Sequence, residues 1–144
     1  MNLFGLLDIS GSALNAERQR AEIVTSNLAN AETTHTADGG PYRRQMVVFE
    51  TSKPSSFGQT LSGLHKEYAR GVTVESIVAD NTPPFQRFEP SHPDADKQGY
   101  VSYPSINPVE EMAELMEAAR AYQMNVAAVQ ATKGMISASL DILR

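Results

Sequence analysis

The sequence contains no cysteine, which excludes disulfides, thiolate metal sites and cysteine nucleophiles. Its net charge is -5 at pH 7 and no cluster of Lys or Arg interleaves with aromatic residues, so a phosphate backbone finds no basic field. No run approaches the roughly 18 apolar residues of a membrane span. The first seventeen residues hold no Lys or Arg, so a cleaved signal with a basic start is not expected. Nucleic acid and membrane insertion are disfavoured, while export by a machine that needs no cleaved signal stays open.

Proline is absent from both ends of the chain. All eight prolines fall between Pro41 and Pro108 in a chain of 144 residues with ordinary globular composition. Because proline breaks helix interiors, we expect helices at the two ends and an irregular or β-rich middle. The predicted class is α+β, with long terminal helices packed as an antiparallel coiled-coil-like pair beside a small β-rich domain. The segments are 1–34, 35–106 and 107–144, with a loop at about 51–70.

The N-terminal segment carries a weak heptad pattern. Its apolar positions recur every three or four residues, interrupted by Ser10 and Glu17. Gly5 and Gly11 lower helix propensity near the start, so we expect a firm helix from about Ser12 to Ala31. The predicted packing positions are Leu7, Leu14, Ala21, Val24 and Leu28.

The C-terminal segment carries a stronger pattern. Asn107 can cap a helix, Pro108 suits its first position, and Glu110 follows three residues after the cap, as in a capping box. At about 1.5 Å per residue, this helix would be roughly 55 Å long, which suits a rod-like bundle. A 3,4,3,4 spacing places Met112, Leu115, Ala119, Tyr122, Val126, Val129, Lys133, Ile136, Leu140 and Leu143 on one seam.

Four short strands are expected in the middle, at residues 42–50, 71–78, 85–88 and 100–103. This middle holds too few large apolar residues to cover two long helices. The seams could pair with each other, or each helix pair could lie against neighbouring copies or relatives. Alanines on several faces of the last segment favour the second arrangement.

Candidate chemical sites are few. Asp94, Asp96, Gln98 and Gly99 match the first half of a calcium loop, but Ser105 stands where a bidentate carboxylate is needed. The three histidines lack metal-ligand spacing, and no nucleophile or nucleotide motif occurs. We therefore expect no enzyme activity, no metal and no cofactor, and a turn at residues 92–100 whose aspartates bond the backbone.

The stretch SNLANAETT at residues 26–34 consists mostly of small and polar residues. It is either a helix end rich in cap formers or a close-packed polar interface. Lys133 is the polar residue of the last seam. It is either a surface lysine or a register-setting partner of Glu17.

Two regions carry recognisable motifs: DISGSALNAERQRAEIVTSNLANAETT with DGGPYRRQMVVFE, and HPDADKQGYVSYPSINPVEEMAELMEAARAYQMNV ending in LDIL. Both regions resemble the flagellar axial family of rod and hook proteins, and in particular proximal-rod subunits. The family motif residues are Ser26, Asn27, Leu28, Ala29, Asn30, His92, Pro93, Asp94, Asp96, Gly99, Tyr100, Asn107, Pro108, Glu110, Glu111 and Met112.

The resemblance implies a structural subunit of the basal-body rod, exported uncleaved by the flagellar type III apparatus into a shaft that crosses the periplasm. Its terminal helices would form the tube that transmits torque and lines the export channel. Implied partners are rod subunits of the FlgB, FlgF and FlgG types, a rod-base adaptor of the FliE type and further copies of itself. The alternative is a coiled-coil adaptor or export-linked binding protein; an enzyme built on His92, Asp94 and Asp96 is a third class.

Overall fold

The computed structural model describes residues 3–37, 39–52 and 70–142. Helix α1 spans Leu3–Ala29 and helix α3 spans Pro108–Ile142. Between them, β1 (Gln45–Thr51) pairs antiparallel with β2 (Val72–Ala79), and β3 (Phe85–Phe88) pairs antiparallel with β4 (Tyr100–Tyr103). The predicted α+β class is confirmed.

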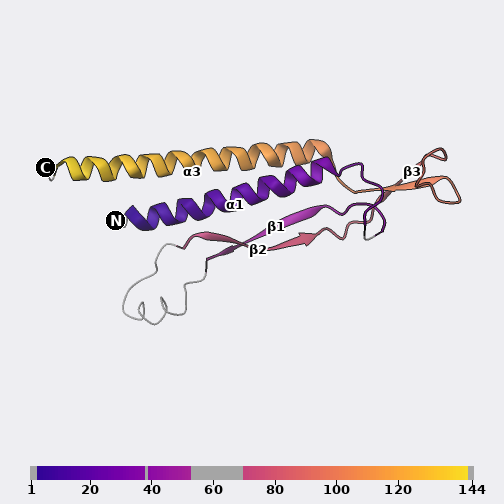
Figure 1. The fold of residues 1–144 in the computed structure, drawn as a ribbon, viewed down its shortest axis with the longest axis horizontal. Helices are drawn as coiled ribbons and strands as arrows, with labels where there is room; N and C mark the ends of the chain where they lie inside the picture. The colour runs from indigo at the N-terminus through magenta and orange to yellow at the C-terminus, as the bar shows by residue number, and fades with distance from the viewer. Residues whose placement is uncertain (1–2, 38, 53–69, 143–144) are drawn as a thin grey trace, which may run out of the picture.

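The elements form three layers (Figure 1). Helix α1 lies between α3 on one side and the β1–β2 hairpin on the other, and the two helices run antiparallel, so both chain ends lie at the same end. The β3–β4 hairpin projects from the opposite end. Among the described elements, α3 packs along α1 alone.

Helix α1 begins at Leu3, so the turns before Ser12, which the sequence left open, are helical as well. Leu3 and Leu7 are half-buried, and a side chain at Gly11 would meet no atom within 4 Å. Burial of the apolar residues therefore outweighs the weak helix propensity of the two glycines. The helix ends at Ala29, close to the predicted Ala31.

The strands lie close to their predicted positions. The β1–β2 register pairs Met46 with Val78 and Val48 with Ser76, and a bulge follows Val48. Residues 53–69 of the predicted loop at 51–70 lie outside the described residues, as do residues 143–144, including Leu143 of the predicted seam. The division into three segments stays a prediction.

The seam of α3 is rotated from the predicted one. Leu115, Val126, Val129 and Ile136 are half-buried, but Met112, Ala119, Tyr122 and Leu140 are exposed. In the described part of α3, the buried residues are Glu111, Ala118 and Thr132, each one residue before a predicted position and spaced by multiples of seven residues. Within this chain, α1 thus covers a mostly small and polar line of α3.

The buried apolar core is small. Ala16 and Val24 are buried on α1 and Ala118 on α3, and Val101, Tyr103 and Ile106 lie in and after β4. The accessible surface is 10480 Å², whereas a compact monomer of this mass exposes roughly 7,300 Å². The chain alone is therefore more open than a compact monomer of its mass.

Candidate assembly surface and the polar junction behind it

Asn27 joins the end of α1 to the start of β1 and to α3. Its side chain is 1% exposed. Its Nδ2 donates to the Gln45 carbonyl at 2.8 Å and to Glu111 Oε2 at 3.1 Å. Its Oδ1 accepts the Gln45 N–H at 2.9 Å and the Tyr42 hydroxyl at 3.1 Å. Both donors and both acceptor sites of the amide are used, so asparagine is the side chain that this position requires.

Glu111 is equally buried, at 1% exposed, on the first turn of α3. Its Oε1 accepts Arg44 Nε at 2.5 Å, and Arg44 Nη2 donates to Glu114 Oε1 at 2.7 Å. Burial alone lowers the pKa of Arg44, but the hydrogen bonds and charges of Glu111 and then Glu114 outweigh it and raise the pKa above its ordinary value. We call Asn27, Tyr42, Arg44, Gln45, Glu111 and Glu114 the polar junction.

The polar junction explains the rotation of α3. Burying a carboxylate without partners is costly, but the buried carboxylate of Glu111 bonds to the amide of Asn27 and the guanidinium of Arg44. Turning Glu111 toward α1 turns Met112 outward, where it is 52% exposed.

The rest of the SNLANAETT stretch is also engaged within the chain. Asn30 Nδ2 donates to the Ser26 carbonyl, and Asn30 Oδ1 accepts the Thr33 hydroxyl. The Thr34 hydroxyl donates to Asp94 Oδ2 at 2.6 Å. The polar groups of Asn27 and Asn30 are thus satisfied internally, and contact of this stretch with other subunits stays a prediction. Of the other motif residues here, Leu28 is half-buried and Ala29 is exposed.

The turn at residues 92–100 is held by backbone hydrogen bonds. Asp96 Oδ1 accepts the N–H groups of Gln98 and Tyr100, and His92 Nδ1 accepts the N–H of Asp94. Gly99 has a φ of 85°, which favours glycine. Pro93 is exposed. In the described part of the chain, no group of three or more His, Asp or Glu side chains could hold a metal ion.

The start of α3 is capped by its own sequence. Asn107 Oδ1 accepts the N–H of Val109 at 3.1 Å, and Asn107 Nδ2 donates to Glu110 Oε1 at 3.1 Å. Asn107 therefore caps the helix, as the sequence predicts. Glu110 reaches back to the side chain of the cap residue, and the helix begins at Pro108.

Within this chain, Lys133 does not pair with Glu17. Arg20 pairs with Glu117 at 3.6 Å, which with the Asn27–Glu111 bond fixes the antiparallel register. In that register Lys133 lies opposite the start of α1, roughly 18 Å along the helix axis from Glu17. Glu17 is instead 3.9 Å from Arg20, and Lys133 is exposed.

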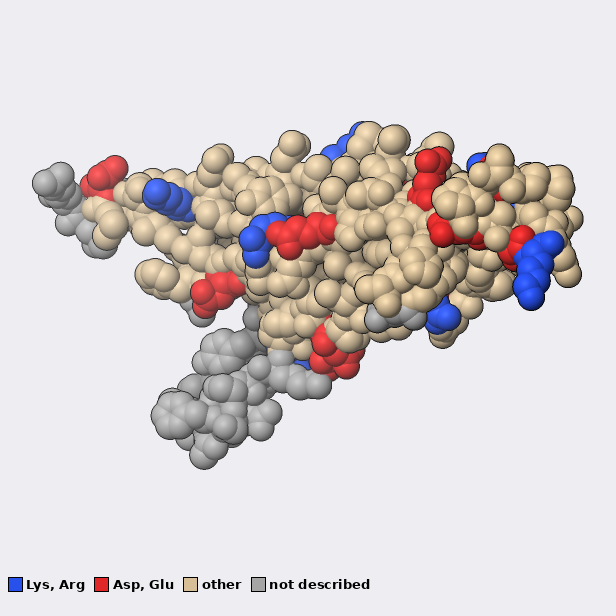
Figure 2. Space-filling model, turned by 45° about the vertical axis from the view of Figure 1, so that its right-hand side comes forward, with Lys and Arg blue, Asp and Glu red and all other residues tan. Residues whose placement is uncertain are grey.

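The side of α3 that faces away from α1 exposes several methionines and small residues, with Arg120 and Gln123 among them. Val109 is 74% exposed, Met116 56% and Met124 68%. We define the outer face of α3 as the exposed residues Val109, Met112, Ala113, Met116, Met124, Ala127, Ala131 and Gly134. In the view of Figure 2, wide areas of the helical region carry no charged side chain, and charges gather toward the end that carries β3.

Such a surface is suited to close helix packing. Exposed methionines adapt their shape to a partner, and alanine and glycine let helix backbones approach closely. None of the described helices combines the length and hydropathy that a membrane span requires.

Sequence reasoning singled out Asn27 and Glu111 but missed their partners. Tyr42, Arg44 and Glu114 complete the polar junction. A usable signal was present: Glu111 and Glu114 are three residues apart on one helix face, which matches the two-pronged geometry of a guanidinium.

The chain is similar to known proteins over its whole length. The family model "Flagella basal body rod protein" matches residues 7–34, and "Flagellar basal body rod FlgEFG protein C-terminal" matches residues 97–142. The flagellar basal-body rod protein FlgC of Bacillus subtilis is 39% identical over 99% of this chain and 99% of the relative. That of Borreliella burgdorferi is 37% identical over 100% and 99%, and that of Salmonella typhimurium is 37% identical over 99% and 98%.

Proposed function

The chain belongs to the FlgC family of flagellar basal-body rod proteins and is a structural subunit of that rod; from this premise we propose that it assembles through the outer face of α3. One observation carries the proposal. Helix α1 covers a small, polar line of α3, while Met112, Met116 and Met124 on the other side are at least half exposed.

The mechanism is mechanical. Torque would pass from subunit to subunit through densely packed helices, because close-packed interiors have low compressibility and transmit strain. A heterologous contact that does not close into a ring generates a tube of such helices. Within each subunit, the polar junction would fix the angle between the helix pair and the β1–β2 hairpin, so that the outer face keeps one orientation.

The partners in this proposal are other rod subunits of the FlgB, FlgF and FlgG types, a FliE-type adaptor and further copies of the chain. The chain would reach the rod through the flagellar type III apparatus without a cleaved signal and stand where the rod crosses the periplasm. No step of this role needs catalysis.

A deletion strain tests the proposal. We expect it to lose rods and swimming, and wild-type chain to restore both. The variant Met116→Glu with Met124→Glu should fail, because carboxylates in a packed helix interface are left without partners. The paired variant Met116→Leu with Met124→Leu keeps the surface apolar and should restore swimming.

Two outcomes would contradict the proposal at different points. Normal swimming of the deletion strain would remove the rod role. Normal rods from the glutamate variant would remove the outer face of α3 as the interface. Urea unfolding of the purified variants provides the folding control, because side chains this exposed contribute little to the stability of the isolated chain.

A further inference from the structure

The methionine side chains that the structure describes are all exposed. Four of the six methionines in the sequence lie on α3, where Met112 is 52% exposed, Met116 56%, Met124 68% and Met135 45%. Met46, on β1, is 39% exposed. Methionine is more often buried in an apolar core. The sulfur atoms of α3 are instead open to reagents dissolved in water.

The composition makes these thioethers the targets of an oxidant. The sequence contains no cysteine, so its sulfur chemistry is confined to methionine. Hydrogen peroxide transfers one oxygen atom to the sulfur: its O–O bond breaks, an S=O bond forms, and the peroxide is reduced to water while the thioether is oxidised to a sulfoxide. A thiol-dependent sulfoxide reductase reverses the step, releasing the oxygen as water while two thiols are oxidised to a disulfide.

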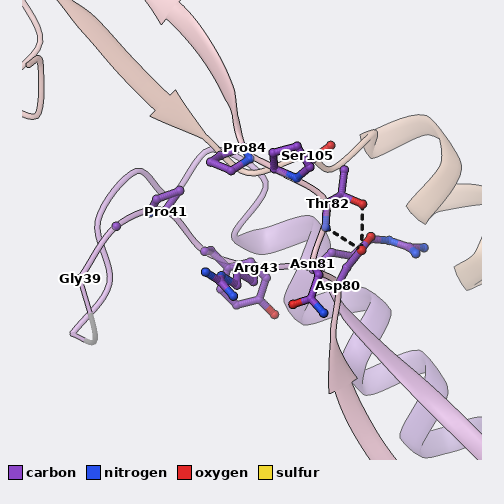
Figure 3. A pocket seen from close by; sticks show the side chains of 12 residues that line it. Gly39, Pro41, Arg43, Asp80, Asn81, Thr82, Pro84 and Ser105 are labelled. Atoms are coloured by element: carbon purple, nitrogen blue, oxygen red, sulfur yellow. Dashed lines mark hydrogen bonds between the residues drawn. The ribbon is translucent and has the colours of Figure 1, made fainter.

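Oxidation would change the outer face of α3 and leave the fold in place. The buried residues of α3 and the polar junction contain no methionine. Methionine is also absent from the residues that line the cavity of about 200 Å³ between the loop after α1 and the linker from β2 to β3, shown in Figure 3. The bonds that hold the subunit together therefore stay intact when the exposed methionines are oxidised.

A sulfoxide at Met116 or Met124 would oppose helix packing. It replaces an adaptable apolar side chain by a polar one, whose oxygen needs a donor in a packed interface. Ala113 and Ala127, each three residues from one of these methionines, offer no side-chain donor. Arg120 lies four residues from both, but it could donate only by bringing its charge into the interface, which costs further desolvation.

We infer that Met116 and Met124 form an oxidation-sensitive switch, in which the sulfoxide form of the subunit stays folded but does not assemble. The inference rests on the proposed function, because oxidation of the outer face matters only if that face is an interface. In an assembled rod, the neighbouring helices would cover these sulfur atoms. The switch therefore acts on subunits that have not yet assembled.

The chemical step is tested on the purified full chain with hydrogen peroxide. Mass spectrometry of its peptides should show Met116 and Met124 oxidised before Met135 and Met46, in the order of their exposure. Circular dichroism and the urea midpoint should match those of the untreated chain. Slower oxidation of Met116 and Met124 than of Met46, or unfolding on oxidation, would overturn the inference.

The consequence is tested in the deletion strain, by counting rods after growth with sublethal hydrogen peroxide. Peroxide should lower the rod number about tenfold more with wild-type chain than with Met116→Leu and Met124→Leu together. Met46→Leu is the matched control, since it removes an exposed methionine outside α3, and should stay as sensitive as wild type. Met116→Gln with Met124→Gln places neutral polar side chains there and should form few rods without peroxide.

Equal loss of rods in wild type and in the leucine variant, or normal rods from the glutamine variant, contradicts the switch. Failure of the glutamate variant beside normal rods from the glutamine variant leaves the interface standing and removes the switch alone. Normal swimming of the deletion strain removes the rod role, whereas the order of oxidation in the purified chain does not depend on that role.

Discussion

Asn27 shows how one side chain can fix the relation of three elements. Its amide bonds both backbone groups of Gln45, the hydroxyl of Tyr42 and the carboxylate of Glu111. Removing one partner of a buried hydrogen bond costs more than the bond itself contributes, because the other partner is left dehydrated and unpaired. The orientation of the hairpin and of α3 therefore depends on this residue.

Asn27→Ala should lower the free energy of unfolding by about 2 to 4 kcal/mol, since it leaves several buried polar groups without partners. Urea unfolding followed by circular dichroism measures this change. Asn30→Ala is the control, because the Asn30 side chain bonds locally to Ser26 and Thr33. It should cost less than about 1 kcal/mol. Equal losses for the two variants would show that Asn27 has no special position.

The pair Glu89 and Tyr103 links stability to pH. The Tyr103 hydroxyl donates to Glu89 Oε2 at 2.9 Å. This bond lowers the pKa of Glu89 below 4.5 and raises the pKa of Tyr103 above 10.0. A lowered carboxylate pKa gives stability that is present above pH 4.5 and lost as pH falls further. A raised phenol pKa gives stability that is present below pH 10.0 and lost as pH rises further.

Tyr103→Phe should therefore flatten both limbs of the stability profile. Urea midpoints of wild type and variant, measured from pH 3 to about 11, provide the comparison. The wild-type advantage should be largest near neutral pH and should shrink at both extremes. A difference that stays constant across the range would mean that only packing of the ring distinguishes the two chains.

The sequence predicted the elements well because their signals are local. The strands at 85–88 and 100–103, the cap at Asn107 and the helix from Pro108 all follow from turn, cap and proline chemistry. The rotation of α3 could not be predicted in this way. From the sequence alone, an apolar seam through Met112 is the more plausible contact with α1 than a line through Glu111. The structure shows that Arg44 and Asn27 bond to Glu111, which makes burial of its carboxylate favourable.

The same limit applies to the candidate site. Composition indicated that the helices lack a core of their own, and the exposed methionines of α3 agree with that. The partners of Asn27 lie 15, 18 and 84 residues away along the chain, so no short pattern reveals them. Local periodicity thus predicts that the helices carry apolar surface better than it predicts which face of each helix is buried within the chain.

Gly71 allows the β1–β2 hairpin to approach α1 closely. A Cβ there would clash with the side chain of Ser12, whose Oγ also accepts the Val72 N–H at 3.0 Å. Gly71→Ala should displace Ser12 and lower stability by about 1 to 3 kcal/mol. Thermal unfolding of the purified chain measures this loss.

Gly11 is the matched control on α1, because an added Cβ there meets nothing within 4 Å. Gly11→Ala should raise stability by about 0.5 to 1 kcal/mol, since alanine is the better residue in a helix interior. Opposite signs for the two glycines would establish the close approach at Gly71. A stabilising effect of both would show that the hairpin can move away from α1 at little cost.

At the scale of the whole molecule, the cross-helix bonds gather at one end. Asn27 with Glu111 and Arg20 with Glu117 lie near the β3 end, whereas α3 continues past the start of α1 at the other end, as Figure 1 shows. Leu140, at 63% exposed, lies in this extension. In the isolated subunit, the two helices are therefore held together at the end where the hairpins join them. At the opposite end, the surface of α3 is largely uncovered.

This gradient predicts the pattern of backbone hydrogen exchange in the isolated chain. Amides near the polar junction, at residues 16–27 and 111–129, should exchange slowly because opening them breaks buried bonds. Amides at residues 136–142 should exchange quickly, since an uncovered helix end frays at little cost. Mass spectrometry of peptides from the purified full chain measures both regions in one experiment, and Asn27→Ala should speed exchange at 111–129 while leaving 136–142 unchanged.

Uniform protection along α3 would contradict this prediction, because it would mean that α3 is stable as a helix without α1. Its outer face would then be fully formed before any neighbour arrives, and some other feature would have to prevent subunits from assembling early.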